Sequence, residues 1–535
     1  MQIDGRTVAN GADIQADLCV VGAGAAGITL CLQLAHTPLR ILLIESGGDD
    51  PDPTTQRLAG GENTGLPYFP LDAARLRCFG GTTAHWGGFC RPFYDIDFEE
   101  RPWVPHSGWP ITRKDLLPFY PLAQKLCQVG PFAYEPSDWQ LADAPPLPLA
   151  GQDVLTRLIQ FSPPTRFGVR YRNNIMSAAN IRTYLYSNVL AVVPAVDGTR
   201  IERLDVATLA GNRYTVHAGT FVIATGGIEN ARLLLASNQV IREGVGNKYD
   251  LVGRFFAEHI NLDTAGVFPR DPKTSFSLYQ RTSRATLRQP RVAGEQPASL
   301  MGYVELSEAV QRSARTLNFS ADIEQTFWSD YFLHDERYYG EDRLYRDDSH
   351  SRLKDMEDVL STMWRNLSDV AQTAFGSGSA SNKIFYKVVT TQEQAPNPDS
   401  RVTLAAEKDQ FGRPLTRLCW ELTDLDRYTI KVAMQRLAQA LGAAGIGSLH
   451  VAIDLDGGPW PTHLQGSWHH SGTTRMHSDP RRGVVDADCR VHGISNLYIA
   501  GASVFPTIGN GNPTLTIVAM SARLAEHLRT RLKLS

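Results

Sequence analysis

The clearest pattern of hydrophobic and polar positions near the amino terminus is a short apolar run, a glycine turn and a second apolar segment. Asp17–Val21 has the composition of a buried strand, Gly22–Gly27 interrupts it, and residues from Ile28 to Ala35 continue as an apolar segment. A second strand-like run, Ile41–Glu45, ends in a carboxylate. The order predicts a strand, a tight turn, a helix and a parallel strand.

The glycine spacing in this segment favours a dinucleotide site. Gly22 permits the turn, Gly24 lets the backbone approach a pyrophosphate, and Gly27 allows close helix packing. The first N–H groups of the helix would face the phosphates. Glu45 follows Gly27 by 18 residues, close to the roughly 20 expected for an acid that binds a ribose. The alternative is an ordinary glycine turn.

The strand-to-glycine pattern returns twice. Residues 201–225 alternate like paired strands, and Thr220–Gly227 then predicts a buried strand and a second glycine turn before a helix from Asn230 to Leu235. Leu497–Gly501 is the third such edge. We therefore expect an α/β fold with one discontinuous Rossmann-like domain for FAD or another dinucleotide, made of residues 1–110, 175–262 and 455–535.

The intervening residues, 111–174 and 263–454, are expected to form an α+β substrate-binding domain with a largely antiparallel sheet. Its candidate strands are Ala298–Leu306, Ile384–Thr390 and Val402–Leu404. A helix is predicted from Leu425 to Leu441, capped by Thr423 or Asp424, with a single apolar stripe of Ile430, Met434, Leu437 and Leu441.

Composition narrows the class of protein. The chain has 535 residues, of which 42% are hydrophobic, enough for a large core and at least two structural units. A net charge of −3 argues against nucleic acid as a partner. The longest apolar stretch, Leu18–Ala35, contains three glycines, and more acid than base precedes it, so we expect neither a membrane span nor a signal peptide, and a cytoplasmic location. Seven cysteines without CxxC spacing predict packing rather than disulfides or a metal site.

Candidate chemistry lies near the carboxyl end. Gly466–Met476 carries the pair His469 and His470, and Gly509–Thr516 carries Asn512. Oxidising an alcohol requires a base near the hydroxyl and a donor that holds its oxygen. Histidine suits the base because its pKa is near neutral. A lone histidine is more often a satisfied core residue, and Asn512 before Pro513 is also typical of a helix N-terminus.

Several motifs together resemble the glucose-methanol-choline (GMC) oxidoreductases. They are Gly22–Gly27 with Glu45, Gly80–Gly88, Ala224–Gly227, Val252–His259, His469–Thr473 and Asn512–Thr516. The His85-Trp86 pair, Ser107–Ile111 and Ile228–Arg232 look most like pyranose 2-oxidase, the bacterial glucoside 3-dehydrogenases and the C-glycoside 3-oxidases within that family. The resemblance implies FAD as cofactor and a sugar hydroxyl as substrate.

The resemblance also implies roles for individual residues. His469 stands at the position of the base, Asn512 would hold the substrate oxygen, and His470 would support the fold or contact substrate. The helix from Pro513, carrying Thr514, Ile517 and Met520, would point its positive end at the flavin pyrimidine ring. The expected cofactor-binding residues are Gly22, Gly24, Ala25, Ala26, Gly27, Glu45, Gly81, Thr82, His85, Trp86, Gly87, Gly88, Val189, Ala224, Thr225, Gly226, Gly501, Ala502, Pro513 and Thr514.

Two features of the segment Gly80–Gly88 bear on flavin chemistry. His85 occupies the place of a histidine that is bonded to the flavin in pyranose oxidases, whereas many relatives with a similar pair hold FAD without a covalent bond. Gly87 stands where pyranose oxidases carry threonine. A dehydrogenase that uses a quinone or cytochrome-type acceptor is therefore at least as well supported as an oxidase that uses O₂.

The expected substrate contacts are less specific. Thr326–His334, continuing to Trp364, is rich in aromatic and acidic residues and includes Trp328, which can stack on a sugar or belong to a core or interface. Gln394 lies in a segment that resembles the family, but Pro396 and Pro398 also suit a surface turn.

The sequence thus predicts an FAD-dependent oxidoreductase acting on a secondary hydroxyl of a pyranose or glycoside, with C3 favoured over C2. Three alternatives remain open: a hydroxynitrile-lyase-like member with a redox-silent flavin, a GMC dehydrogenase of a non-sugar alcohol, and a nicotinamide enzyme, since Glu45 also suits NAD.

Overall fold

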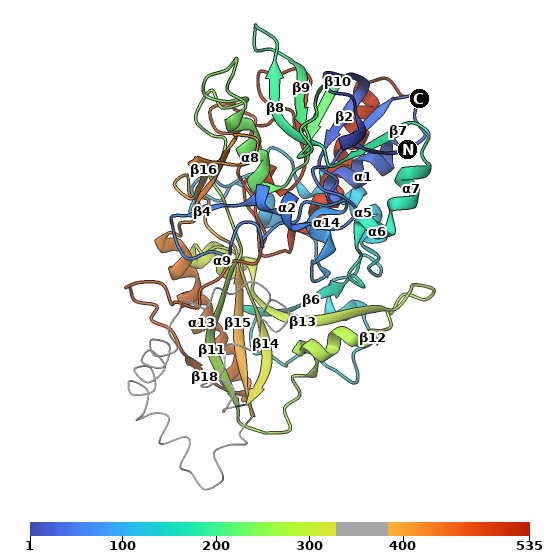
Figure 1. The fold of residues 1–535 in the computed structure, drawn as a ribbon. Coiled ribbons are helices and arrows are strands. Elements are labelled where there is room, and N and C mark those ends of the chain that lie inside the picture. Colours follow the sequence, from blue (N-terminus) through green and yellow to red (C-terminus); the bar gives the residue numbers. More distant parts are fainter. Residues whose placement is uncertain (328–383, 535) are drawn as a thin grey trace.

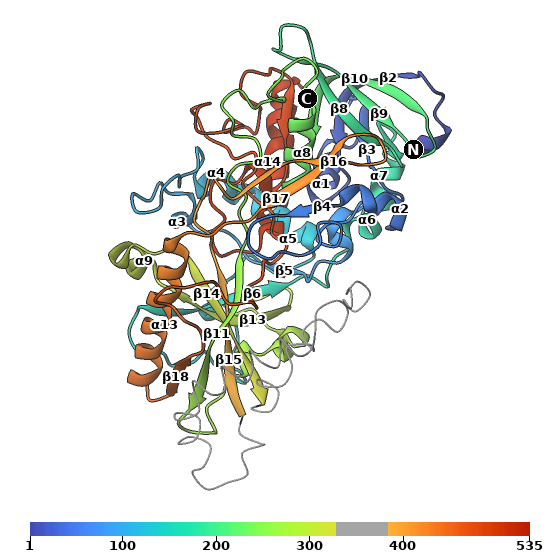
Figure 2. The ribbon, with the colours of Figure 1, turned by 60° about the vertical axis from the view of Figure 1, so that its left-hand side comes forward.

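A computed structural model describes residues 1–327 and 384–534 of the chain. Two large sheets organise it, and Figures 1 and 2 show them at opposite ends of the molecule, with long loops between them. The candidate site is built from these loops.

The first sheet is centred on β2 (Asp13–Val21), which pairs in parallel with β3 (Ile41–Ile44) and β10 (Arg213–Ile223). The strand β19 (Leu497–Ile499) joins β10 in parallel, with Phe221 opposite both Cys19 and Leu497. The full order is β1 (Gln2–Asp4), β7 (Ile181–Leu185), β3, β2, β10, β9 (Ile201–Ala207) and β8 (Asn188–Pro194). Three distant strand-to-glycine edges meet in one sheet, which confirms the predicted discontinuous Rossmann-like fold.

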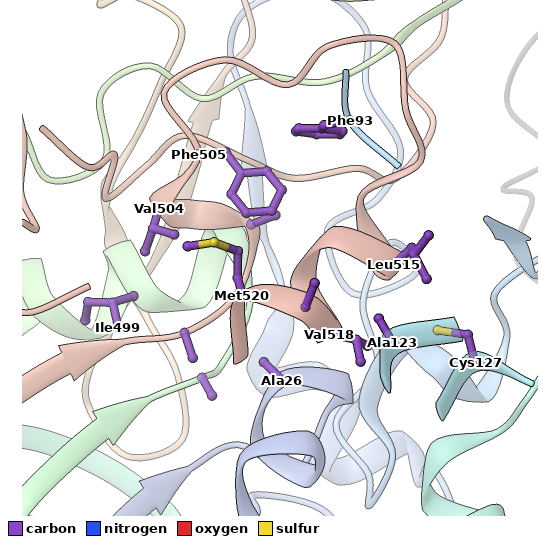
Figure 3. Close-up of a cluster of buried hydrophobic side chains, with 14 of the residues drawn as sticks. Ala26, Phe93, Ala123, Cys127, Ile499, Val504, Phe505, Leu515, Val518 and Met520 are labelled. Carbon is purple, nitrogen blue, oxygen red and sulfur yellow. The ribbon is translucent and has the colours of Figure 1, made fainter. Parts of the chain in front are cut away.

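The helices that follow these strands start earlier than the sequence predicts. The helix α1 spans Ala25–Leu34 instead of starting at Ile28, because the turn is complete at Gly24 and Gly27 already lies within the first helical turn. The helix α8 spans Gly227–Ala236. The helix α14 (Pro513–Arg531) packs beside α1 and α5 (Tyr120–Cys127), and Figure 3 shows Val518 between Ala26 and Ala123. This buried contact fixes the start of α14 relative to the glycine turn.

The second sheet is antiparallel at every pairing along its path, as predicted. Its order is β18 (Gly447–Val451), β11 (Ile260–Pro269), β15 (Ile384–Gln392), β14 (Phe319–Phe327), β13 (Ala298–Leu306), β6 (Val154–Phe161) and β5 (Phe89–Cys90), with β12 (Leu287–Arg288) beside β13.

One predicted strand lies elsewhere. Val402–Leu404 belongs to β16 (Arg401–Lys408), which pairs with β17 (Pro414–Cys419), and β17 pairs in parallel with β4 (Gly61–Asn63). The assignment of Val402–Leu404 to the large antiparallel sheet was wrong, because β4 from the amino-terminal part of the chain supplies its sheet.

The long helix beside this sheet is α13 (Asp424–Ala443), close to the predicted range. Thr423 is its cap: the Thr423 backbone N–H and hydroxyl both donate to the Asp426 carboxylate, at 2.6 and 2.8 Å. The remaining α-helices of the described residues are short: α2 (Pro53–Gln56), α3 (Asp95–Phe98), α4 (Arg113–Leu116), α6 (Phe167–Arg170), α7 (Arg172–Ser177) and α9 (Glu308–Ala314).

All seven cysteines are free, and six are buried, as expected for a packing role. Within residues 1–327 and 384–534, no helix combines the length and apolar character needed to cross a membrane. The division into 1–110, 175–262 and 455–535 against 111–174 and 263–454 stays a prediction.

Candidate active site

Two side chains that are 43 residues apart in sequence meet at the centre of the site. Asn512 immediately precedes α14, and its Nδ2 lies 3.4 Å from Nε2 of His469, which is in the loop before β19. Asn512 occupies the cap position of α14 but its side chain makes no capping hydrogen bond. The asparagine amide therefore serves the histidine rather than the helix.

The loop that carries His469 is fixed against the ends of two Rossmann strands. The Gly472 N–H donates to the carbonyl of Ala502, just after β19, at 3.1 Å. A Cβ on Gly227, at the start of α8, would lie only 2.2 Å from the carbonyl oxygen of His470. The predicted base is thus held next to the two glycine turns that follow β10 and β19.

A third residue, His259, completes a chain of hydrogen bonds to the histidine. His259 Nε2 lies 2.9 Å from the carbonyl oxygen of Gly509, and His259 Nδ1 lies 2.8 Å from His469 Nδ1. A carbonyl only accepts, so the proton of His259 is assigned to Nε2 and its Nδ1 must accept from His469 Nδ1–H. The remaining lone pair of His469 is then on Nε2, facing Asn512.

The surroundings keep both imidazoles neutral. Burial, followed by the charge of Arg91, lowers the pKa of His259 to about 4. Burial, with the neighbouring His259, His470 and Arg91, lowers the pKa of His469 well below its usual value. A neutral imidazole is the form that can accept a proton.

Glu258 and Tyr68 form the other side of this cluster. The Tyr68 hydroxyl donates to Glu258 Oε2 at 2.5 Å, and the His469 backbone N–H donates to both carboxylate oxygens at 2.8 and 3.0 Å. Burial raises the pKa of Glu258 to about 7. Gly466 is tightly enclosed, because a Cβ there would lie 2.6 Å from both the Glu258 and Tyr68 side chains.

Two buried ring nitrogens near His469 have no hydrogen-bond partner among the described residues: Nε2 of His470 and Nε1 of Trp468. The Trp468 ring stacks on His85, with ring centroids 5.0 Å apart. The His470 ring faces Tyr68 and Phe256 at 5.9 and 6.0 Å. Buried polar atoms rarely stay unpaired, so these nitrogens indicate a ligand in the adjoining space.

The glycine turns leave room for such a ligand. Gly24, Gly226 and Gly501 follow β2, β10 and β19, and a Cβ at any of them would meet no atom within 4 Å. The opposite holds for Gly27, where a Cβ would lie 2.0 Å from the Gly22 carbonyl oxygen. Three open glycines above one closed turn form a cradle that fits the pyrophosphate of a dinucleotide.

The segment Gly80–Gly88 borders this cradle. Gly81 is so close to the phosphate loop that a Cβ on it would lie 3.0 Å from Gly24 Cα. Trp86 Nε1 donates to the Thr165 carbonyl at 2.9 Å, and the Gly87 carbonyl accepts from Arg284 Nη2 at 2.7 Å. The segment is therefore held over the glycine turn and between the two sheets.

Glu45 lies beside the first glycine turn, and its predicted contact with a ribose stays a prediction. Its Oε2 accepts the Ala23 N–H at 2.9 Å and its Oε1 accepts the Gly47 N–H at 3.0 Å. Val189, at the start of β8, lines a cavity of about 40 Å³ together with Arg77 and Glu229. The other predicted cofactor residues stand at the ends of the elements described above: Ala25 and Ala26 begin α1, Thr82 follows Gly81, Gly88 precedes β5, Ala224 and Thr225 follow β10, Ala502 follows Gly501, and Pro513 and Thr514 begin α14.

The predicted substrate residues have different outcomes. Gln394 is fully buried, and its amide oxygen accepts the Glu258 N–H at 3.0 Å and Trp420 Nε1–H at 2.9 Å. It supports the backbone of Glu258, and its predicted contact with substrate stays a prediction. Trp328, with most of the aromatic stretch to Trp364, lies outside the described residues.

Sequence reasoning assigned no role to Glu258, His259 or Tyr68. A signal existed for two of them, since Val252–His259 is one of the motifs that carry the family resemblance. Tyr68 lies in a loop before Gly80–Gly88 without periodicity or motif.

Comparisons with known proteins concern the family and the fold. A family model described as GMC oxidoreductase matches residues 396–521. The chain is 26% identical to 6'''-hydroxyparomomycin C oxidase of Streptomyces lividus, over 96% of this chain and 92% of that protein. A C-glycoside 3-oxidase of Microbacterium trichothecenolyticum is 35% identical over 23% of each chain. The fold resembles a formate oxidase of Aspergillus oryzae, with a TM-score of 0.55, 15% identity, and coverage of 98% of this chain and 100% of that one.

Proposed function

We propose that this chain, which belongs to the GMC oxidoreductases, uses FAD to oxidise a secondary hydroxyl of a pyranose sugar or glycoside to the keto sugar. The observation that carries the proposal is the 3.4 Å approach of His469 Nε2 and Asn512 Nδ2, in a loop tied to the ends of β10 and β19. The relatives named as oxidases of an aminoglycoside and of C-glycosides support a sugar substrate, and the second supports C3.

His469 and Asn512 have separate roles in the oxidation of the alcohol. His469 Nε2 takes the hydroxyl proton, since its lone pair is fixed there by the bond from His469 Nδ1 to His259. Asn512 Nδ2 donates to the substrate oxygen and holds it as negative charge develops. When bound, FAD would supply the acceptor for the hydride, with its two electrons, that leaves the carbon as this carbon becomes a carbonyl. The cradle of Gly24, Gly226 and Gly501 would hold FAD, and the first N–H groups of α14 would stabilise negative charge on it.

Polar side chains of the antiparallel sheet contact the loop before Asn512 and Arg91, which suits a sugar substrate. Asn510 Nδ2 donates to Glu305 Oε2 on β13 at 3.4 Å, and Arg91 Nη2 donates to Ser320 Oγ on β14 at 3.1 Å while its guanidinium lies over the Tyr303 ring. These groups can donate to and accept from ring hydroxyls. Gly87 stands where pyranose oxidases carry threonine. We therefore propose either O₂ or a quinone or cytochrome-type carrier as the electron acceptor.

A panel of free sugars and glycosides, each assayed with O₂ and with a quinone or dye, tests the proposal. We expect turnover with at least one pyranoside and a 3-keto product identified by NMR. Cyanide release from a cyanohydrin with an unchanged flavin spectrum would instead establish the lyase alternative. Turnover confined to non-sugar alcohols would exclude a sugar as the substrate.

Replacing Gly27 by alanine is expected to abolish retention of FAD. The new Cβ would lie 2.0 Å from the Gly22 carbonyl oxygen, so the phosphate loop must move. The measurement is the ratio of flavin to protein absorbance after purification. Gly442→Ala is the matched control, because a Cβ at this position in α13 meets nothing within 4 Å and alanine favours a helix by roughly 1 kcal/mol. A full complement of FAD in Gly27→Ala would contradict the assigned cradle.

Replacing His259 by phenylalanine is expected to slow flavin reduction by about 10- to 100-fold, the loss typical when the partner that orients a metal-bound imidazole is removed. The variant removes the acceptor for His469 Nδ1–H and leaves FAD in place. His492→Phe is the control, since His492 also bonds a backbone carbonyl, that of His477 at 2.8 Å. Stopped-flow absorbance under anaerobic conditions gives the rate, and an unchanged rate in His259→Phe would show that the tautomer of His469 is set by another group.

A further inference from the structure

Glu258 is a fully buried acid with all its hydrogen bonds directed at the catalytic cluster. Its Oε1 accepts the backbone N–H of His259 at 2.9 Å and of His469 at 2.8 Å, and its Oε2 accepts the Tyr68 hydroxyl at 2.5 Å. Glu258 is 0% exposed to solvent. Once this carboxylate is deprotonated, its donors are all uncharged, so no cation offsets its negative charge.

The carboxylate is close to both imidazoles. One oxygen of Glu258 and one ring nitrogen each of His259 and His469 lie within 4.8 Å of one another. These residue types also bind metals, but the two histidine nitrogens are hydrogen bonded at 2.8 Å, whereas two nitrogens on a tetrahedral zinc stay about 3.3 Å apart. The arrangement therefore favours a proton-sharing cluster over metal ligation.

The charges around His469 do not otherwise favour its protonated form. His259 and His470 are neutral neighbours, and Arg91 contributes positive charge. Arg75, near Tyr68 and His470, is also positive. Glu393, whose charge reaches His259, is already paired with Arg101 at 2.6 Å. Among the groups that face the pair in the described chain, Glu258 is the acid without a cationic partner.

We propose that Glu258 is a positioning residue for His469: it fixes the His469 backbone and supplies the negative charge that stabilises the imidazolium formed when His469 takes the substrate proton, while the Tyr68 hydroxyl favours the charged carboxylate. This inference rests on the proposed function.

Glu258 is expected to set the pH dependence of the rate of flavin reduction. The pKa of His469 is lowered well below its usual value, so the base is neutral throughout the range near pH 7. Burial raises the pKa of Glu258 to about 7. The rate of flavin reduction should therefore rise with pH as the carboxylate forms, around pH 7. Tyr68→Phe removes a donor to the carboxylate and should move this rise to higher pH by about one unit.

The same group links stability to pH. Because its pKa is raised on folding, Glu258 in the folded protein holds a proton that the unfolded chain has lost between about pH 4.5 and pH 7. Its contribution makes the free energy of unfolding fall as pH rises through that window. Glu258→Gln cannot titrate, so its proton uptake on folding should be smaller than that of the wild type by about one proton.

The test compares anaerobic flavin reduction from pH 5.5 to 8.5, with the sugar that gives the fastest turnover, in the wild type, Glu258→Gln and Tyr68→Phe. Tyr171→Phe is the control, since Tyr171 is a buried tyrosine that donates to the Leu126 carbonyl at 2.7 Å. We expect Glu258→Gln to bind FAD, to react on the order of 100-fold more slowly at pH 8, and to lose the rise near pH 7.

A wild-type rate in Glu258→Gln, or a rise near pH 7 that persists in it, would overturn the role of Glu258. If Glu258→Gln does not retain FAD, the Tyr68→Phe profile decides, and an unshifted profile overturns the proposal. Failure of every sugar to reduce the wild-type flavin instead overturns the proposed function itself.

Discussion

His469→Ala is expected to retain FAD and to reduce it about 10³-fold more slowly than the wild type under anaerobic conditions. A positioned general base contributes roughly 10²- to 10⁴-fold, and His469 Nε2 is the accepting nitrogen that faces Asn512. FAD should stay bound because the cradle is formed by Gly24, Gly226 and Gly501, where even an added Cβ would meet no atom of His469 within 4 Å.

The measurement is stopped-flow absorbance of the flavin, with the flavin-to-protein ratio recorded for each variant. His450→Ala is the control, since His450 is an exposed histidine on β18. Rapid reduction in His469→Ala would remove the base assignment. If His469→Ala lost FAD together with activity, the loop that carries His469 would be needed for FAD binding in addition to the three glycines.

Arg101→Met is expected to lower the free energy of unfolding by about 3–5 kcal/mol, because it leaves the buried Glu393 carboxylate without its cation. Both side chains are 0% exposed, and Arg101 donates to the two Glu393 oxygens at 2.8 and 2.6 Å. Burial alone would raise the pKa of the Glu393 carboxyl. The charge of Arg101 outweighs burial and holds that pKa below its usual value.

This ion pair also supports the active site. Asn318 Nδ2 donates to Glu393 at 2.9 Å and to Asp97 at 2.8 Å. The Asp97 backbone carbonyl accepts the Thr507 hydroxyl at 2.7 Å, and a Cβ on Gly509 would lie 2.6 Å from the Asp97 carboxylate. The Gly509 carbonyl that fixes the tautomer of His259 is therefore packed on this network, and Arg101→Met should slow flavin reduction as well.

Denaturant titration gives the change in stability. Arg312→Met is the matched control, since Arg312 pairs with Glu99 on the surface at 2.7 Å with both side chains at least 40% exposed, and such pairs contribute about 0–1 kcal/mol. The double variant Arg101→Met with Glu393→Met should recover most of the loss. Equal effects of Arg101→Met and Arg312→Met would contradict the importance of the buried pair.

The nucleotide-binding half of the fold was predictable because its information is local. Gly22–Gly27, Thr220–Gly227 and Leu497–Gly501 each combine an apolar strand with a glycine turn, and their pairing into one sheet follows from the parallel-strand rule. The start of α1 was misplaced because glycine has a low helix propensity, whereas tight packing of Gly27 on Gly22 overrides it.

The site was predictable only in part. The resemblance singled out His469 and Asn512, but their partners depend on a long-range pairing: Ala257 and Ser471 exchange backbone hydrogen bonds at 3.1 and 3.0 Å. That bridge sets Glu258 and His259 beside His469, and no periodicity or motif spacing encodes it. Gln394 was expected near substrate because its motif matched, yet its amide is used to hold the Glu258 backbone.

Hydride transfer from a sugar carbon to the flavin is best tested by a primary deuterium isotope effect on anaerobic bleaching of the bound flavin. Enzyme is mixed with the sugar that gives turnover, carrying either hydrogen or deuterium on the carbon that becomes the carbonyl. We expect complete bleaching, slowed several-fold by deuterium, because the hydride leaves from the carbon whose hydroxyl proton His469 accepts. A flavin spectrum that no sugar changes, or bleaching that deuterium at that carbon does not slow, would contradict hydride transfer from the sugar.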